Sequence, residues 1–496
     1  MKNRILILSI FFTFISSFCS IISGEYISAQ DMNGNTVRGY FGSSIANIGN
    51  LDGYGIEDLV VGVPLSDTNV MNSGSVEILF LNKTEYYTTV TLDNNSPLLT
   101  DSLATEDLFG SSVSFLGDFY GNGNKVIAVG APGTDYDGYS SIGCVWLLEL
   151  NHSGTILSSK RIKYPDSGNN FFLFGSSSAP LKGINGLNNR VIAIAAPGFY
   201  SSKGCIFIVK VNVDNTITLL NDIVGRDIGS SVVDGDCFGA SMANAGDLDN
   251  NGVDDLIVGA PLNDSDGKSG NGAFYIIYLN NDGSVNDYKK FFPQDVGIDS
   301  EDYSQCGYAV TTLNDIDRDG NNEILISSYQ RDQTSINRGS IDIVSLDHNE
   351  NFLWSKNLND GSLDAQLYDN DMFGSSVTGY QDMNENGIPT VIACASNSNG
   401  GIGSFFKINV TGPVATDSAY VENATDVDLN CTANTKGIDT ELYYEYGLSE
   451  SFGDTLFYGI DINSSTAEAF FKNISILDTN TTYYYRAITS NINGIS

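Results

Sequence analysis

The chain has 496 residues, 41% of them hydrophobic, and a formal net charge of −36 from 60 acidic and 24 basic residues. This length holds one large domain plus a small one, or three average domains, and the apolar content excludes global disorder. A surface this negative repels phosphate groups, which excludes nucleic acid and anionic membranes as partners. The 52 glycines against 10 prolines favour many short strands and tight turns over long helices.

Residues 1–20 have the pattern of a secretory signal peptide. Lys2 and Arg4 form a basic start, residues 5–15 are almost wholly apolar, and small residues follow. The apolar run is too short to span a bilayer comfortably. We therefore expect cleavage near Cys19 or Ser20, a secreted or cell-surface location, and no membrane span in this chain.

Six cysteines follow the signal peptide, and an even count in an exported chain permits disulfides in several pairings. Cys144 and Cys205 stand at equivalent places in neighbouring repeats. This position favours small buried side chains over a disulfide framework.

A Phe-Gly pair recurs along the chain at intervals of 64 to 68 residues. Its six copies, one with cysteine in place of phenylalanine, begin at Phe41, Phe109, Phe174, Phe238, Cys306 and Phe373. A second signature, Gly-Ala-Pro or a variant of it, ends 23 residues after each start. A constant internal spacing between variable linkers indicates six copies of one structural unit.

Each unit is predicted to form four short antiparallel strands, which is typical of a propeller blade. A strand of small residues follows Phe-Gly, where several blades crowd one axis, and a near-continuous apolar strand lies between neighbouring blades. Residues 25–30 stand where a fourth strand precedes every other Phe-Gly. We expect them to complete the sixth blade and close the ring.

These units resemble the FG-GAP repeats of integrin α-subunit propellers over residues 25–412. The resemblance implies an all-β propeller that binds calcium, acts in cell adhesion as a glycoprotein, and recognises an extracellular protein or glycan, with a possible partner chain. The family has seven blades. Six are countable here, and the even spacing leaves no room for a hidden unit, so we expect six.

The repeat pattern stops near residue 412, and residues 413–496 resemble a fibronectin type III-like β-sandwich. A strand is expected at the run Glu-Leu-Tyr-Tyr-Glu-Tyr-Gly, residues 441–447, and another over 477–488. The chain stops where the last strand of that family follows, so we expect the sandwich to be incomplete. Five glycosylation sequons lie in this tail, at Asn423, Asn430, Asn463, Asn473 and Asn480.

The turn between the first and second strands carries acidic residues at alternate positions in several units. In repeat four the oxygen ligands are predicted to be Asp247, Asp249, Asn251, the carbonyl of Val253, and Asp255. In repeat five they are Asp315, Asp317, Asp319, Asn321 and Glu323. Calcium requires six to eight oxygens, and the glycine after the fifth position supplies the sharp turn. These loops resemble the calcium hairpins of integrin blades.

The other units have fewer ligands. Weaker calcium loops are predicted in repeat one at Asn50, Asp52 and Asp58, and in repeat six at Asp382, Asn384 and Asn386. The corresponding segments of repeats two and three are expected to be plain turns.

A cation coordinated by one loop has no open position for a reaction, so we interpret these sites as structural. In an antiparallel blade the calcium turns lie on the face opposite the loops that follow Gly-Ala-Pro. By resemblance to integrins, we expect a partner to bind at those loops, at 65–73, 133–142, 198–203 and 262–271.

The sequence predicts a binding module and not an enzyme. Its two histidines, His152 and His348, lie in different repeats, and no hydrolase, Walker or dinucleotide motif is present. Two alternatives stay open. One is a calcium-dependent polysaccharide-cleaving propeller, marked by an axial cleft where acidic and basic residues converge. The other is a structural spacer of a surface protein.

Overall fold

The computed structural model describes residues 39–411 with short gaps, and the strand backbones of residues 20–28 and of the segment 415–495. The gaps fall at residues 55, 68–69, 82–87, 100–102, 165–169, 230–231, 266, 300, 317–320, 333–335, 361–362, 364–366 and 381–388. The predicted signal peptide before residue 20 lies outside the described residues.

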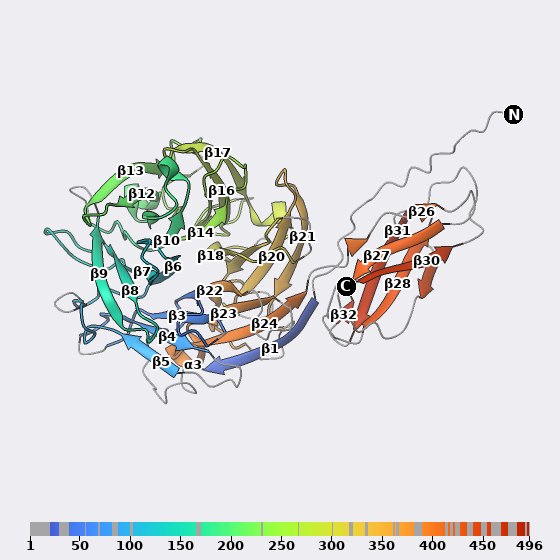
Figure 1. The fold of residues 1–496 in the computed structure, drawn as a ribbon, viewed down its shortest axis with the longest axis horizontal. Helices are drawn as coiled ribbons and strands as arrows, with labels where there is room; N and C mark the ends of the chain where they lie inside the picture. Colours follow the sequence, from blue (N-terminus) through green and yellow to red (C-terminus); the bar gives the residue numbers. More distant parts are fainter. Residues whose placement is uncertain are drawn as a thin grey trace.

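Six four-stranded sheets stand around one axis and form a β-propeller, as Figure 1 shows in colours from blue to orange. Within each sheet the neighbouring strands are antiparallel. The first strands of neighbouring sheets contact one another around the whole ring, the sixth with the first included. The six-blade prediction is therefore confirmed.

The strands take equivalent places in every blade. The innermost strands are β2 (Ser44–Gly49), β6 (Ser112–Gly117), β10 (Ser178–Leu181), β14 (Ser241–Gly246), β18 (Cys306–Thr312) and β22 (Phe373–Tyr380). The second strands are β3 (Asp58–Val63), β7 (Lys125–Ala131), β11 (Val191–Ala196), β15 (Asp255–Ala260), β19 (Ile324–Ser328) and β23 (Thr390–Ala395). The third strands are β4 (Ser75–Phe80), β8 (Cys144–Leu150), β12 (Cys205–Val211), β16 (Ala273–Leu279), β20 (Ser340–Leu346) and β24 (Ser404–Thr411). The outermost strands are β5 (Thr88–Leu92), β9 (Ile156–Lys163), β13 (Ile217–Val224), β17 (Val285–Phe291), β21 (Phe352–Leu358) and β1 (Ser20–Ser28).

The ring closes through the N-terminal strand. β1 pairs with β24 as the outermost strand of blade six, and the blue and orange ribbons run side by side in Figure 1. The expected closing segment, 25–30, overlaps this strand, which starts earlier, at Ser20. Pairing the two ends of the propeller in one sheet covers the edge that β24 would otherwise expose.

The core lies between the blades. Six apolar clusters fill the six contacts between neighbouring blades, and the cluster that joins blade six to blade one includes Phe41, Ile392 and Phe405. The second strands β11 and β15 are buried along their whole length. The near-continuous apolar runs of the sequence follow from this burial on both faces.

Glycines permit the close stacking of one blade on the next. The glycine before each third strand has a φ between 83° and 96°, and a Cβ there would stand 1.9–2.2 Å from the carbonyl oxygen of the next blade's repeat start. These six residues are Gly74, Gly143, Gly204, Gly272, Gly339 and Gly403. Only glycine has room at this contact, since a Cβ atom never comes so near a backbone oxygen.

A serine three residues after the repeat start joins the blades at the axis. In five blades its hydroxyl donates a hydrogen bond of 2.8 Å to the carbonyl of the next blade's Phe-Gly glycine. The last of these bonds, from Ser376 to Gly42, runs from blade six to blade one. Blade five has Ala309 at this place.

We predict that Ser112→Ala lowers the free energy of unfolding by about 1 kcal/mol, because the Gly175 carbonyl loses a buried hydrogen bond. Ala309→Ser is the reverse change and is expected to leave stability unchanged or to raise it by up to ~1 kcal/mol. Equilibrium urea unfolding measures both. Equal losses in the two variants would contradict an inter-blade role for this position.

Two further four-stranded sheets follow the ring. One contains β25 (Ala415–Thr416), β26 (Tyr420–Val421), β27 (Val427–Ala433) and β30 (Glu468–Ile474), and the other β28 (Thr440–Gly447), β29 (Asp454–Phe457), β31 (Tyr484–Asn491) and β32 (Gly494–Ile495). β28 matches the strand expected at 441–447, and β31 overlaps the end of the strand expected at 477–488. Two sheets of this size are typical of a sandwich. The resemblance to fibronectin type III domains stays a prediction.

Helices are few and short among the described residues. They are η1 (Ile184–Gly186), α2 (Phe199–Ser202), η2 (Pro293–Val296) and α3 (Ser398–Gly401). Within the described part of the chain, no helix has the length and apolar character that crossing a membrane requires. Cys144 and Cys205 are buried with free thiols, as their equivalent positions suggested.

Candidate metal centre

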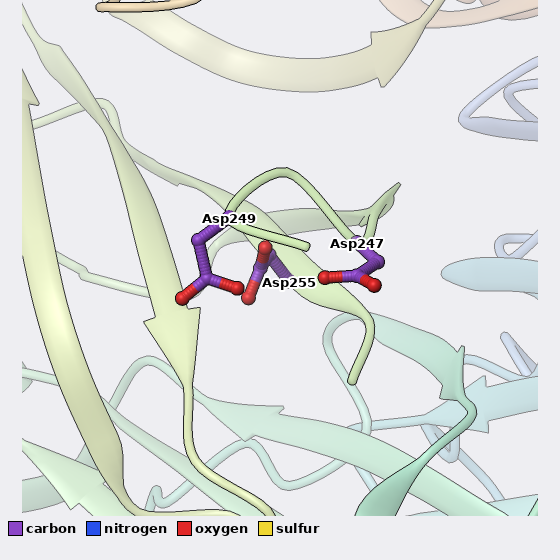
Figure 2. Close-up of side chains that lie close together, drawn as sticks. All are labelled: Asp247, Asp249 and Asp255. Carbon is purple, nitrogen blue, oxygen red and sulfur yellow. The ribbon is translucent and has the colours of Figure 1, made fainter. Parts of the chain in front are cut away.

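Three carboxylates converge in the turn between β14 and β15 of blade four, as Figure 2 shows. Asp247, Asp249 and Asp255 each offer an oxygen, and these oxygens lie within 4.8 Å of one another. Asp247 and Asp249 are exposed, whereas Asp255 is buried. The geometry therefore brings together three of the five ligands predicted for repeat four.

Asp255 anchors the turn to the blade. One of its carboxylate oxygens accepts the Leu248 N–H at 2.8 Å, and the other accepts the Leu279 N–H, at the end of β16, at 2.9 Å. Asp58 does the same in blade one, for the Leu51 N–H at 2.7 Å and the Leu81 N–H at 3.0 Å. The ninth position of the loop thus has a structural role that does not depend on a metal.

Backbone N–H groups and the side-chain amide of Asn251 hold the two exposed carboxylates in place. Asp247 accepts hydrogen bonds from the N–H groups of Asn251 and Gly252, each at 2.9 Å. The φ of Gly252 is +87°, which the sharp turn requires. The Asn251 amide donates to Asp249 at 3.0 Å and to the Leu279 carbonyl at 2.8 Å. Val253 is buried and has an aliphatic side chain, so its backbone carbonyl is the only oxygen it can offer.

Burial and mutual repulsion disfavour negative charge in the turn. Burial raises the pKa of Asp255 to about 7, and the charges of Asp249 and Asp247 add to the increase, while the N–H groups of Leu279 and Leu248 oppose it. Burial likewise raises the pKa of Asp58 to about 6. A nearby cation favours the ionised form of such carboxylates.

The oxygen set fits calcium. Calcium–oxygen distances are about 2.3–2.6 Å, so two ligands on opposite sides of the ion stand about 4.6–5.2 Å apart. The three carboxylates lie within this span of one another. Magnesium requires a tighter octahedron, with oxygens at about 2.0–2.1 Å.

The structure covers the other predicted loops in part. In blade one Asn50 accepts the Gly53 N–H at 2.6 Å and Asp52 accepts the Tyr54 N–H at 2.8 Å, which shapes the turn above the buried Asp58. In blade five Glu323 is buried and accepts the Ile316 N–H at 2.8 Å.

The remaining predicted ligands of blades five and six are placed as follows. The amide of Asn321 donates to the Leu346 carbonyl at 3.2 Å, and the backbone N–H of Asp315 donates to the Asn322 side chain at 3.2 Å. Asp317, Asp319, Asp382, Asn384 and Asn386 lie outside the described residues.

Sequence reasoning missed one pair of residues that supports the turn. The Asn244 amide donates to Asp254 at 2.7 Å, and Asp254 also accepts the Lys182 N–H from blade three at 3.0 Å. Asn47 and Glu57 form the same pair in blade one, at 2.6 Å. The two pairs stand at the same distances from the Phe-Gly start of their repeats, and this shared spacing was a visible signal. Asp254 lies next to a predicted ligand and was not singled out.

A channel of about 480 Å³ runs along the propeller axis and is lined by residues of all six inner strands. Serine, alanine, asparagine and small apolar residues predominate, and the described residues that line it include no acidic or basic side chain. An axial cleft with converging charges, the mark of the polysaccharide-cleaving alternative, is therefore not found among the described residues.

The comparisons with known proteins find FG-GAP repeats and integrin α subunits. A family model described as FG-GAP repeat matches residues 238–277, which contain the blade-four turn. Integrin alpha-2 of Bos taurus is 25% identical over 288 residues, which cover 57% of this chain and 22% of that protein. The propeller is integrin α-like. Integrin alpha-PS2 of Drosophila melanogaster is 27% identical over 146 residues, which are 29% of this chain and 10% of that protein.

This integrin-like chain spans about a fifth or less of the length of these relatives. A solved structure titled as an exo-beta-1,3-galactanase from Phanerochaete chrysosporium with galactose matches 94% of this chain and 96% of its own, at 10% identity and a TM-score of 0.31. A likeness at this level carries no argument about fold or activity.

Proposed function

We propose that the chain is a calcium-stabilised extracellular binding module of the adhesion type, which recognises a protein or glycan through the propeller face opposite the calcium turns. The convergence of Asp247, Asp249 and Asp255 carries the calcium part of this proposal. In each antiparallel blade the turn from first to second strand and the loop from second to third lie at opposite ends. The integrin-like repeats support the adhesion part.

The proposal gives calcium a structural role and assigns no catalytic residue. Cleavage after Cys19 or Ser20 would remove at most the first residue of β1, since that strand starts at Ser20, and this is compatible with export. By analogy with integrins, a partner chain and a fibronectin type III-like second domain belong to the proposal. The competing function is that of a passive spacer, which would bind no partner through either face of the propeller.

Masking one face at a time tests this proposal. Tyr200 lies in a loop after a second strand and is 61% exposed, and Val213 lies at the other end of the same blade and is 84% exposed. Each is replaced with cysteine and coupled to a bulky polymer. The described cysteines of the natural chain are buried or half-buried, so the two variants share the same background.

We predict that beads coated with the Val213→Cys conjugate adhere to host cells and matrix as the natural chain does, whereas the Tyr200→Cys conjugate loses most adhesion. Cell and bead counts under flow give the readout. Equal adhesion of both conjugates would refute the assigned face, and no adhesion by the natural chain would favour a spacer.

The net charge of −36 predicts no binding to nucleic acid at physiological salt. A gel-shift titration with generic duplex DNA checks this. A shift that disappears as salt is raised would contradict the prediction.

A further inference from the structure

Blade five differs from its neighbours at one position of the third strand. Three residues after the glycine that precedes this strand, blades two, three, four and six have an aromatic residue. These residues are Trp146, Phe207, Tyr275 and Phe406. In blades two and four a cation from the outermost strand stacks over the ring, Arg161 over Trp146 and Lys290 over Tyr275. Blade five has Asp342 here, paired with Asn357 on β21.

A pocket of about 510 Å³ opens where the aromatic ring is missing. Its walls come from three parts of the chain: the segment after η2, the loop after β19, and the strands β20 and β21. The residues that matter for binding are Asp299, Glu301, Arg331, Asp342, Ser355 and Asn357. The volume is within the range of about 300–1,000 Å³ that is typical of small-molecule sites.

Arg331 is the unusual group of this pocket. Its side chain is only 2% exposed and is surrounded by carboxylates, with Asp299 at 3.1 Å, Asp342 at 3.6 Å and Glu301 at 3.7 Å. The two longer distances exceed hydrogen-bond length. Among the described atoms, Nε and Nη1 of Arg331 and one carboxylate oxygen of Asp342 have no hydrogen-bond partner. Buried polar atoms normally have one, from protein, water or ligand.

The chemistry of the walls restricts the ligand. Three carboxylates and one guanidinium give a net negative pocket, which disfavours anions, while the central Arg331 repels cations. Among the described residues, no aliphatic or aromatic side chain lines it, which disfavours an apolar ligand. The Arg331 guanidinium donates hydrogen bonds and the carboxylates accept them, while the Asn357 amide already donates to Asp342 at 2.8 Å. A neutral molecule whose groups both donate and accept satisfies this set.

We propose that the pocket of blade five binds a neutral saccharide unit, whose hydroxyl groups accept from Arg331 and donate to Asp342. Each hydroxyl supplies one donor and two acceptor sites, which matches the two kinds of buried atom left without partners. At the rim, the ring of Phe352, which is 39% exposed, lies beside Gly297.

The inference deepens the proposed function and rests on it, because the pocket is built from the connections on the face assigned to partner binding. Arg331 follows a second strand, and Asp299 and Glu301 belong to the connection from blade four to blade five. Both kinds of connection lie at the end of the blade away from the calcium turns.

Titration calorimetry and saturation-transfer NMR test the inference on the full, calcium-loaded chain. The probes are glucose, mannose, galactose and N-acetylglucosamine, followed by neutral oligosaccharides of the sugar that binds. We expect at least one sugar to bind the natural chain. The double variant Asp342→Tyr with Asn357→Lys, which transfers the Tyr275 and Lys290 pair of blade four, should weaken that binding about tenfold or more.

Two further variants keep the test decisive. Asp342→Asn retains the shape of the side chain and should also weaken sugar binding, and Glu77→Gln, at the equivalent position of blade one, should not. Circular dichroism and thermal melting confirm that each variant is folded. Equal binding by the Asp342 variants, or binding of guanidinium compounds in place of sugars, would overturn the inference.

Absence of sugar binding by the natural chain would also overturn the inference. The face-masking experiment separates this failure from failure of the proposed function. If masking Tyr200 abolishes adhesion but the natural chain binds no sugar, the binding module stands and the saccharide ligand is rejected. If the natural chain binds a sugar but masking Tyr200 has no effect on adhesion, the face assigned to adhesion is wrong.

Discussion

Removal of calcium is expected to lower the melting temperature of the chain markedly, and re-addition of calcium should restore it. A ligand that binds only the native state stabilises it by RT ln(1 + [L]/Kd), which is about 2.7 kcal/mol per site at a hundredfold excess over Kd. Asp247, Asp249 and Asp255 also repel one another when no cation lies between them. Differential scanning calorimetry with and without chelator measures the effect. Magnesium should restore much less, because its octahedral shell fits a crowded all-protein loop poorly.

A pair of matched variants locates this effect. Asp249→Ala should remove most of the calcium-dependent gain at blade four, because an exposed carboxylate of the cluster is lost while the anchor Asp255 stays. Asp118→Ala is the control, since Asp118 shapes the turn of blade two through a hydrogen bond from the Asn122 N–H at 2.8 Å and belongs to a loop predicted to bind no metal. If chelator leaves the melting curve unmoved, or both variants respond alike, the blade-four loop is only an acidic turn.

Gly130→Ala is expected to be among the most damaging single substitutions in the ring. A Cβ on Gly130 would stand 1.9 Å from the Gly175 carbonyl oxygen of the next blade and 2.3 Å from the Ser112 hydroxyl. Because the first of these atoms is backbone, the clash can be relieved only by moving two blades apart. We expect a loss of about 4 kcal/mol or more, at the extreme of what point substitutions cost.

Gly225→Ala is the control for this prediction. Neither glycine has the positive φ that disfavours other residues, and the nearest atom to a Cβ on Gly225, the Val232 carbonyl oxygen, is 3.3 Å away. In urea unfolding, Gly225→Ala should lower the free energy of unfolding much less than Gly130→Ala does. Similar losses in the two variants would mean that helix or strand preference decides the result and the inter-blade contact does not.

The sequence by itself determined the repeat architecture. The constant spacing from Phe-Gly to Gly-Ala-Pro predicted six blades, and the all-β fold and the order of strands within a blade follow from short-range patterns of apolar and small residues. The convergence of three carboxylates in the blade-four turn was equally readable, because Asp247, Asp249 and Asp255 lie within nine residues and a tight turn brings alternate side chains toward one point. Local chemistry of this kind depends little on the rest of the chain.

Only the tertiary structure decided how distant segments meet. Asp255 could be recognised as a carboxylate, but its bond to the Leu279 N–H exists because β15 and β16 pair. Arg331, Asp342 and Asn357 looked like ordinary polar residues in separate strands and loops. Stacking of blade five beside the connection from blade four buries them together, and burial turns a solvated arginine into a group that requires a partner. A sequence pattern shows residue type and period, whereas burial depends on what the fold brings alongside.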